Sequence, residues 1–335
     1  MNVLVAGGAG YVGSHAHRAL VRAGHTVVVL DNLSAGHRLA VAPQARLVVG
    51  DLEDVGLLDS LFAEEHFDAV MHFAAFIEVG ESVTDPLKFY HNNVGNTVRL
   101  LTAMQRHDVR RLVFSSTCAV YGIPDHMPLV EDMPRAPSSP YARAKLAVEW
   151  ALADSAGAWG LGFVALRYFN AAGAAADATI GEDHHPETHL IPNVLKVPLG
   201  QRPHVRIFGT DYNTPDGTCV RDYVHVEDLA VAHVRALEVL RLGEQRFYNA
   251  GTGRGASVRE VVDIARTVTG HPIPVVEEAR RAGDVPTLYA DASKIRSELG
   301  WAPKYQALSE IIASAWAWHQ SHPRGFDDRP SDTSS

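Results

Sequence analysis

The chain has 335 residues, of which 46% are hydrophobic and 21% are charged, and this composition excludes a fibrous, disordered or membrane-spanning protein. Its length fits one large domain or two closely packed domains. The net charge of −9 argues against nucleic acid and membrane partners, and the isolated Cys118 and Cys219 fit the reducing cytoplasm, so we expect a cytoplasmic protein.

Short β-branched apolar segments alternate with longer amphipathic segments in the first half of the chain. This alternation is typical of βαβ units and predicts an α/β fold with a doubly wound parallel Rossmann sheet. We expect helices at residues 13–23 and 93–107 to cover the faces of this sheet. The predicted strands are residues 3–6, 26–30, 46–49, 69–73, 112–115 and 163–167.

The pattern changes after Asn170, where residues 171–220 are rich in Gly, Pro, His and Asp. This composition predicts substrate-holding loops around one short helix near residues 192–199. A strand at residues 247–250 is expected to return to the sheet. From Arg324 onward the chain is polar and without periodicity, which predicts disorder.

Ser257 and Glu260 form an S-x-x-E capping box, which predicts a helix that ends near Gly270. Its position after the returning strand indicates that a second lobe is interleaved with the first. The expected division is a Rossmann domain over residues 1–170 with a returning segment near 221–250, a smaller α/β lobe over 171–325, and a disordered tail over 326–335.

Gly7, Gly10 and Gly13 lie in the segment GGAGYVG, between the first predicted strand and the first predicted helix. Without Cβ atoms, they let the backbone approach a pyrophosphate, whose charge meets the free N–H groups and the positive dipole end of the helix. The spacing differs from G-x-G-x-x-G. The alternative is a glycine-rich turn that only closes a strand onto a helix.

Two aspartates follow the next predicted strands. Asp31 ends the second strand, where an acidic residue accepts hydrogen bonds from the adenosine ribose of a dinucleotide. A carboxylate there repels a 2′-phosphate, so NAD is favoured over NADP. Asp51 ends the third strand and is expected near the adenine, with a helix N-cap as the alternative interpretation.

Tyr141 and Lys145 share one face of a helix that Ser139 and Pro140 are suited to begin. A cation at this spacing is expected to lower the pKa of the tyrosine toward the range where it acts as a base. The alternative is an exposed, solvated helix face. Thr117 ends the strand that begins at residue 112, at the edge where ligands bind, and is expected to hydrogen-bond the reacting oxygen.

Together these segments resemble the extended short-chain dehydrogenase/reductase superfamily and, within it, the UDP-glucose 4-epimerase family. The likeness runs from residue 1 to about residue 325. The general motifs are GGAGYVG at 7–13, HFAA at 72–75, FSST at 114–117, YARAK at 141–145 and RYFN at 167–170. The more specific motifs are VGESV at 79–83, GEDHHPETHLIP at 181–192, DYNTPDGTCVRDYVHV at 211–226 and RRAGD at 280–284.

The resemblance implies an isomerase that interconverts UDP-glucose and UDP-galactose. In this chemistry Tyr141 removes the proton of the 4-hydroxyl while the C4 hydride passes to a tightly bound NAD. The resulting 4-keto sugar turns over within the site and recovers the hydride on its other face, so that NAD is regenerated in each cycle. Tyr141, Lys145 and Thr117 are the implied catalytic residues.

The resemblance also implies the two binding sets. In the cofactor set, Lys145 hydrogen-bonds the nicotinamide ribose. The cofactor residues are Gly7, Gly10, Tyr11, Val12, Gly13, Asp31, Asn32, Asp51, Leu52, Phe73, Ala74, Ala75, Asn92, Tyr141, Lys145 and Tyr168. The substrate residues are Thr117, Tyr141, Asn170, His189, Leu190, Phe208, Arg221, Arg281, Asp284 and Leu288.

Two features of the implied substrate side have other interpretations. Arg221 and Arg281 are suited to a diphosphate, although a lone arginine is by default a surface ion pair. His184, His185 and His189, with Glu182 and Asp183, raise the question of a metal site. We expect no metal, because His-His-x-x-x-His is not a familiar ligand spacing and hydride transfer to NAD needs none.

Three positions depart from the family pattern. Thr117 stands where many relatives have serine, which keeps the hydroxyl. Ile77 replaces a cofactor-contacting lysine of some bacterial members, so that contact is not carried over. Leu288 replaces a tyrosine that crowds the sugar 2-position, which makes UDP-GlcNAc and UDP-GalNAc additional candidate substrates.

The same fold is compatible with other functions. A 4,6-dehydratase needs an Asp-Glu pair after the threonine, whereas Cys118 and Ala119 stand there and cannot transfer the protons. A catalytically silent NAD-binding regulator, a reductase with exchangeable cofactor, and a pentose epimerase are the further alternatives. Relatives are homodimers through helices that correspond to residues 87–107 and 141–155, so a homodimer is expected.

Overall fold

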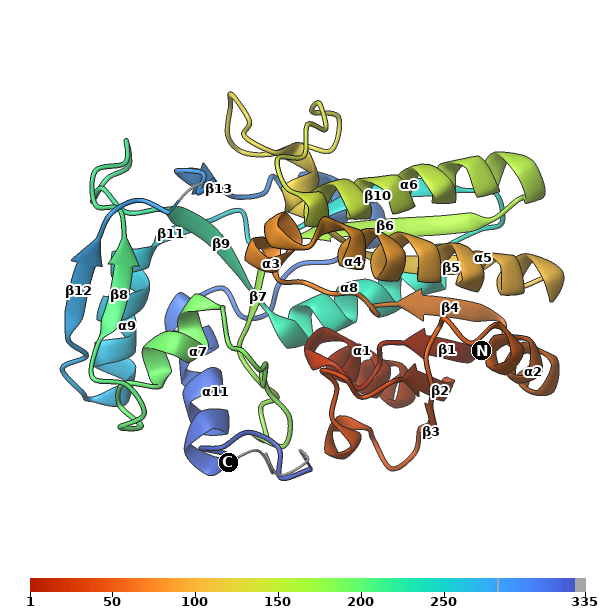
Figure 1. Ribbon diagram of the computed structural model, residues 1–335, viewed down its shortest axis with the longest axis horizontal. Helices are drawn as coiled ribbons and strands as arrows, with labels where there is room; N and C mark the ends of the chain where they lie inside the picture. Colours follow the sequence, from red (N-terminus) through yellow and green to blue (C-terminus); the bar gives the residue numbers. More distant parts are fainter. Residues whose placement is uncertain (282, 329–335) are drawn as a thin grey trace.

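A seven-stranded parallel sheet forms the larger part of the molecule in the computed structural model, which describes residues 1–281 and 283–328 (Figure 1). Its strands are β1 (Asn2–Ala6), β2 (Thr26–Asp31), β3 (Arg46–Val49), β4 (Ala69–His72), β5 (Arg111–Thr117), β6 (Gly162–Tyr168) and β10 (Gln245–Ala250). They are arranged in the order β10-β6-β5-β4-β1-β2-β3, and each neighbouring pair is parallel. The predicted Rossmann sheet and its returning strand are confirmed.

Helices cover both faces of this sheet, because the strands are apolar on both sides. On the first face are α1 (Tyr11–Arg22), α8 (Val226–Val239) and α10 (Ser293–Leu299), and on the second are α2 (Val55–Glu65), α5 (Asn96–Arg106) and α6 (Pro140–Trp159). Side chains alternate along β1: Val3 and Val5 pack in the first core, and Leu4 and Ala6 in the second. The sheet is therefore packed between two hydrophobic cores.

A second group of elements lies beyond the carboxyl ends of the sheet, at the left of Figure 1. Its strands are β7 (Asn170–Ala172), β8 (Val205–Phe208), β9 (Val220–His225), β11 (Gly255–Ser257), β12 (Val275–Glu278) and β13 (Thr287–Leu288), and its helices are α7 (Leu190–Leu195), α9 (Val258–Thr269) and α11 (Leu308–Ser321). Ile191, Val262 and Ile312 pack in its own core. No helix in the described part of the chain is long and apolar enough to cross a bilayer.

Short elements connect these layers. They are α3 (Val79–Thr84), α4 (Pro86–Phe89), a π-helix (Tyr90–Gly95) and two 3₁₀-helices (Arg38–Ala40 and Cys118–Tyr121). The helix predicted for residues 93–107 is therefore wound as a π-helix in its first turn and becomes α-helical only from Asn96. The capping box at Ser257 and Glu260 is confirmed, and α9 ends at Gly270 with φ of 72°.

The prediction that residues 171–220 form loops around one helix is wrong in part. This stretch contains β7 and β8 and reaches the start of β9, and α7 begins at Leu190, two residues before the predicted start. β7 pairs with β9, and β8 pairs with β12, whose residues lie about seventy positions further along the chain. Local composition carries no signal of such long-range pairing, because the partner strands supply the hydrogen bonds.

The predicted disorder from Arg324 is wrong for the residues that the structure describes. The buried Phe326 ring stacks on His37 with centroids 4.5 Å apart, and its backbone N–H donates to Asp183. Asp328 lies 2.9 Å from Nδ1 of His37. One aromatic anchor thus holds a segment whose composition is otherwise polar, while the prediction for residues 329–335 lies outside the described part.

Candidate functional site

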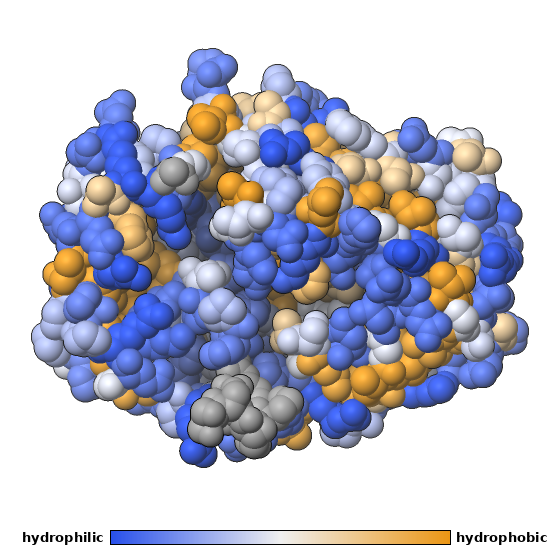
Figure 2. Space-filling view, viewed as in Figure 1, coloured by the Kyte–Doolittle hydropathy of each residue, from blue (hydrophilic) through white to orange (hydrophobic). Residues whose placement is uncertain are grey.

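The predicted site residues gather where the carboxyl ends of the seven parallel strands face the second group of elements. Figure 2 shows that the surface is hollowed between these two parts of the molecule. In the sheet order, β1 and β4 are neighbours, although two strands separate them in sequence. Such a reversal of strand order opens the crevice in which α/β proteins bind their ligands.

The glycine-rich turn leaves the N-terminus of α1 accessible. A Cβ on Gly7, whose φ is 76°, would lie 2.4 Å from the nitrogen of Ala74, and a Cβ on Gly13 would lie 2.1 Å from the oxygen of Gly7. Beside Gly10 a Cβ would meet only that oxygen, at 3.6 Å, and no side chain caps the helix there. The turn therefore does close the strand onto the helix, and it also offers an uncapped helix N-terminus that fits a pyrophosphate.

Asp31 is fixed beside this turn. Its carboxylate accepts hydrogen bonds from the backbone N–H groups of Ala9 and Leu33, each at 2.9 Å. Burial raises the pKa of Asp31, and the two N–H groups act in the opposite direction. The carboxylate is thus an acceptor held at the end of β2, next to the glycine-rich turn.

Asp51 does not cap a helix, so the alternative interpretation of this residue is wrong. Asp54 is the N-cap of α2, and its side chain accepts from the backbone of Leu57. Asp51 instead accepts from the side chain of Asn32 at 2.6 Å and from that of Asn96 at 3.3 Å. These contacts bring the ends of β2 and β3 and the start of α5 together.

The loop after β4 lies directly over the turn. The N–H groups of Phe73 and Ala74 both donate to the oxygen of Ala6, at 2.7 and 3.0 Å. Asn93, which the sequence analysis missed, holds both backbone groups of Phe76. The signal available in the sequence was an asparagine at the start of a predicted amphipathic helix. Of the remaining predicted cofactor residues, Tyr11 and Val12 begin α1, Leu52 is buried after β3, Ala75 follows Ala74, and Asn92 donates to Asn93.

The predicted catalytic residues lie on β5 and on the first turns of α6. Ser139 caps α6 and Pro140 follows it, as expected. Thr117 hydrogen-bonds the Tyr141 phenol, while Lys145 is 3% exposed and donates from Nζ to the oxygen of Ser115 at 2.9 Å. The structure therefore brings the three residues to one edge of the sheet.

The expectation that Lys145 lowers the pKa of Tyr141 is not met in this structure. Burial raises the pKa of the Tyr141 phenol well above its ordinary value, the neighbouring Tyr168 raises it further, and the Thr117 hydrogen bond acts in the opposite direction. Burial also lowers the pKa of Lys145 to about 7. The reason is desolvation, which disfavours both phenolate and ammonium in this apolar position.

Tyr168 completes this edge from β6. Its hydroxyl and that of Ser115 are 2.6 Å apart, and its ring lies edge-on to the ring of His233. The Phe73 ring also contacts His233, with centroids 4.7 Å apart. Two of the predicted cofactor residues thus pack on one buried histidine of α8.

A buried polar network packs against β5, the strand that carries Thr117, and was not predicted from the sequence. Arg167 and Glu149 form an ion pair at 2.7 Å with side chains 0% and 1% exposed. Ser116 donates to Glu149, and Arg167 donates to the hydroxyl of Tyr121. The network joins β5, β6 and α6, and only the RYFN motif pointed toward it.

One group of predicted substrate residues lies on β9 and β13, near the end of β5. Arg221 stands opposite Leu288 in the pairing of these strands. Arg221 lies close enough to Cys118 to oppose the rise in pKa that burial gives that thiol, and Leu288 packs in the same cluster as Cys118 and Phe169. Asn170 begins β7, beside β9.

A second group of predicted substrate residues lies further out. The Arg281 guanidinium is 5.1 Å from the centre of the Phe208 ring, and its Nε is 3.4 Å from the carboxylate of Asp284. The Arg281 side chain is 62% exposed, so its donors face solvent. His189 and Leu190 stand at the beginning of α7. Among the described residues, none of these five makes a hydrogen bond, ion pair or ring contact with Tyr141.

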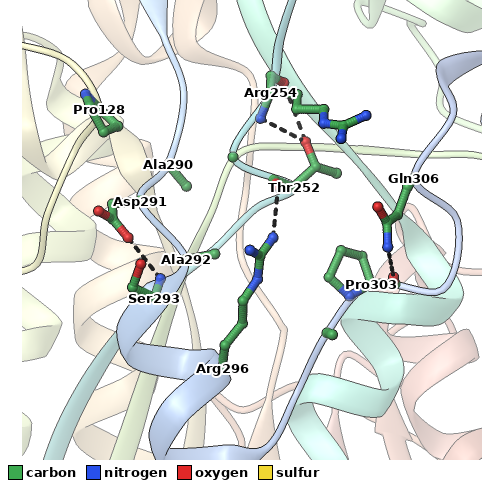
Figure 3. Close-up of a pocket in the computed structure, with 12 residues that line it drawn as sticks. Pro128, Thr252, Arg254, Ala290, Asp291, Ala292, Ser293, Arg296, Pro303 and Gln306 are labelled. Atoms are coloured by element: carbon green, nitrogen blue, oxygen red, sulfur yellow. Dashed lines mark hydrogen bonds between the residues drawn. The ribbon is translucent and has the colours of Figure 1, made fainter.

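A separate cavity of about 460 Å³ is lined by Pro128, Thr252, Arg254, Asp291, Arg296 and neighbouring residues (Figure 3). Arg296 donates to the backbone oxygen of Thr252 at 3.0 Å across this space. Within the described chain, its walls carry none of the residues predicted to hold NAD or a UDP-sugar. The titratable and hydroxyl groups at the sheet edge therefore define the candidate site.

The comparisons with known proteins agree with this geometry. A family model described as "NAD dependent epimerase/dehydratase family" matches residues 3–251. A UDP-glucose 4-epimerase of Lacticaseibacillus casei is 50% identical over 330 residues, which cover 98% of this chain and 100% of that protein. A solved UDP-glucose 4-epimerase has a TM-score of 0.94 at 47% identity, over 98% of this chain and 100% of its own. A Bifidobacterium longum UDP-glucose 4-epimerase in complex with NAD+ and UDP has a TM-score of 0.94 at 39% identity, over 97% and 100%.

Proposed function

We infer, because this chain belongs to the NAD dependent epimerase/dehydratase family, that it catalyses the NAD-dependent, reversible 4-epimerisation of UDP-glucose and UDP-galactose through a transient 4-keto sugar. The likeness to UDP-glucose 4-epimerases covers the second group of elements as well as the sheet. A pentose epimerase and a catalytically silent regulator are therefore not favoured. The observation that carries the proposal is the position of Tyr141, Thr117 and Lys145 at one edge of a dinucleotide-type sheet.

NAD fits the observed cradle. The uncapped N-terminus of α1 would hold the pyrophosphate, and Asp31 and Asp51 would meet the adenosine end. The Asp31 carboxylate favours NAD over NADP, because a 2′-phosphate would place a second negative charge beside it. Bound NAD would supply a hydride acceptor for the C4 hydride and, in its oxidised form, a positive charge at the site.

Residues of the chain itself would remove and return the proton of the sugar 4-hydroxyl. Tyr141 is the base that takes the proton of the sugar 4-hydroxyl, and Thr117 holds the oxygen of that hydroxyl within reach. Lys145 donates a hydrogen bond to the backbone oxygen of Ser115 and would orient the nicotinamide ribose. When Lys145 is protonated, its positive charge would favour the phenolate form of Tyr141. Since burial disfavours the charged forms, the phenolate depends on positive charge supplied at the moment of reaction.

The substrate diphosphate would bind between the two groups of substrate residues. Arg221 and Arg281 offer guanidinium forks, which suit phosphate oxygens, and the Arg281 side chain is 62% exposed. Phe208 and Leu190 would flank the uracil and ribose, and Asn170 would contact the diphosphate or sugar. Asp284, 3.4 Å from Arg281, and His189, at the start of α7, belong to the same proposed set.

The breadth of substrates would depend on Leu288. Its side chain belongs to the cluster that contains Cys118 and Phe169, near the catalytic strand. A leucine leaves more room at the sugar 2-position than a tyrosine would. We therefore extend the proposed substrates to UDP-GlcNAc and UDP-GalNAc.

The remaining proposals concern organisation in the cell. We propose an NAD-binding domain over residues 1–170 and near 221–250, an interleaved UDP-sugar lobe over 171–325, and a cytoplasmic enzyme of galactose metabolism. We also propose a homodimer through the α5 and α6 face, where Val98 and Trp150 are 47% and 59% exposed. Exposed apolar side chains on neighbouring helices are typical of such contacts. Sedimentation of the wild type and of Trp150→Glu would test this association.

The experiment that tests the function uses the purified protein without added cofactor. Incubation with UDP-galactose and, separately, with UDP-GalNAc is followed by chromatography of the products. Conversion to the gluco epimers is expected, because NAD is retained, and the ratio of the two rates tests the Leu288 proposal. Absence of conversion of both sugars, even with NAD supplied, would overturn the assignment of a hexose epimerase.

A further inference from the structure

The loop before α7 carries a cluster of two imidazoles and two carboxylates. One nitrogen or oxygen atom from each of Glu182, His184, Glu187 and His189 lies within 4.8 Å of the others. This set differs from the histidine-rich set considered in the sequence, because His185 is exposed and outside the cluster while Glu187 is inside it. The E-x-H-x-x-E-x-H spacing folds into one site only through the turn at residues 184–187.

These atoms are close enough together to surround one metal ion, and their separations vary more widely than those of a regular tetrahedral site. Nδ1 of His184 lies 3.3 Å from Oε1 of Glu182 and 3.8 Å from Oε2 of Glu187. Nδ1 of His189 contacts the same Oε1 of Glu182 and lies 3.8 Å from Oε1 of Glu187. Four ligands at about 2.0–2.1 Å from a tetrahedral zinc ion are roughly 3.3–3.4 Å apart. All four contacts converge on one small volume.

Burial makes a cation at this point favourable. The Glu182 and Glu187 side chains are only 4% and 3% exposed, so two carboxylates share a nearly dry position. Nδ1 of His184 is shielded from solvent and has no hydrogen-bond partner among the described residues. A divalent cation with two neutral imidazoles would balance both carboxylates and use this nitrogen.

We propose that Glu182, His184, Glu187 and His189 bind one zinc ion. A set of two imidazoles and two carboxylates suits zinc better than magnesium or calcium, which prefer oxygen ligands alone. Because all four positions come from the protein, the ion is structural and does not activate water.

The ion would tie the two ligand sites together. The ring of Tyr11, in the first turn of α1, is edge-on to His184 with centroids 6.0 Å apart. His189 is the residue from which α7 begins. A metal on this loop therefore fixes the start of α7 relative to the glycine-rich turn, independently of the hydride chemistry.

The test measures metal in the full-length, NAD-bound protein after removal of any affinity tag. The wild type, His184→Ala, Glu187→Gln and the control His185→Ala are dialysed against zinc, then against zinc-free buffer, and analysed by mass spectrometry. We expect about one zinc per chain in the wild type and the control, and an affinity roughly 10-fold or more lower in the other two variants. This readout does not depend on epimerase activity.

Cobalt exchange keeps the test decisive if a variant does not fold. The wild type loaded with Co²⁺ is expected to show the visible absorption of a tetrahedral cobalt site, and zinc should abolish it. A wild type that retains no zinc and gives no cobalt spectrum would overturn the proposal. Equal zinc content in the wild type, His184→Ala and Glu187→Gln would overturn it as well.

Discussion

The proposed NAD side and the proposed UDP-sugar side of the site differ in residue type and in exposure. On the NAD side, glycine backbone, buried hydroxyls and nearly inaccessible charged groups such as Asp31 and Lys145, 8% and 3% exposed, line the sheet edge. On the UDP-sugar side, long side chains such as Arg281, 62% exposed, extend from short strands and loops. The first arrangement suits a cofactor that stays bound, whereas the second suits a substrate that enters and leaves in each turnover.

The two sides also differ in how strongly the surrounding contacts stabilise them. The strand β5 lies between two cores and packs beside the buried pair of Arg167 and Glu149. The Arg281–Asp284 pair is separated by 3.4 Å at the surface, where an ion pair contributes little to stability. Substitutions on the NAD side should therefore change kcat or the free energy of unfolding, whereas substitutions on the UDP-sugar side should change KM or substrate selectivity.

The largest effect is expected for Tyr141→Phe. Without the phenol no group is placed to take the proton, so kcat with UDP-galactose should fall about 10²- to 10⁴-fold. NAD should remain bound, because the backbone cradle is unchanged, and its release on denaturation of the protein measures this. Retention of a large part of the activity would remove Tyr141 from the role of base.

Next in size is the effect of Arg167→Met on stability. Removing one partner of the buried pair leaves the charge of Glu149 uncompensated, which should lower the free energy of unfolding by about 3–5 kcal/mol. The matched control is Arg110→Met, which breaks the exposed pair with Asp108 and should cost about 1 kcal/mol or less. Urea denaturation followed by fluorescence compares the two variants, and equal losses would contradict the difference in support.

Acid should weaken the NAD side through its buried histidines. Burial lowers the pKa of His15 and of His72 to about 3, well below the ordinary value of 6.5. Because the folded pKa is the lower one, the stability that these neutral rings contribute is complete above pH 6.5 and is lost as the pH falls toward 3. Near pH 5, His15→Asn should therefore take up about one proton fewer on unfolding. The pH dependence of urea midpoints measures this uptake, and an unchanged slope would contradict the pKa shift.

A smaller and different effect is expected for Arg281→Ala. Loss of a charged hydrogen-bonding partner of the diphosphate, at about 1.5–3 kcal/mol, should raise KM roughly 10- to 100-fold with little change in kcat. The neighbouring Arg280→Ala is the control, since Arg280 is paired with Asp211. A fall in NAD content or in kcat alone would show that Arg281 does not belong to the UDP-sugar side.

The smallest effect is expected for Leu288→Tyr, which changes selectivity. The added ring should reduce the rate with UDP-GalNAc relative to UDP-galactose by roughly 10-fold or more. Leu288→Met preserves the volume and serves as the control. Product chromatography with both sugars gives the ratio, and an unchanged ratio would mean that another residue limits the sugar 2-position.

Local sequence patterns were sufficient to predict the Rossmann sheet, the glycine-rich turn and the positions of Tyr141 and Thr117 at the edge of the sheet. These features follow from local patterns: apolar periodicity, glycines between a strand and a helix, and the capping residues of α6. The cofactor and the reaction were also predicted, because the motifs of one family extend along nearly the whole chain.

Other features depend on contacts that form only when the chain folds. The pairing of β8 with β12 and the anchoring of Phe326 on His37 join residues far apart in sequence, for which no local pattern exists. Burial reversed the expected shift in the pKa of Tyr141. Folding also brought Arg167 and Glu149 together as a buried ion pair. Distance and desolvation set these properties, and both are known only once the chain has folded.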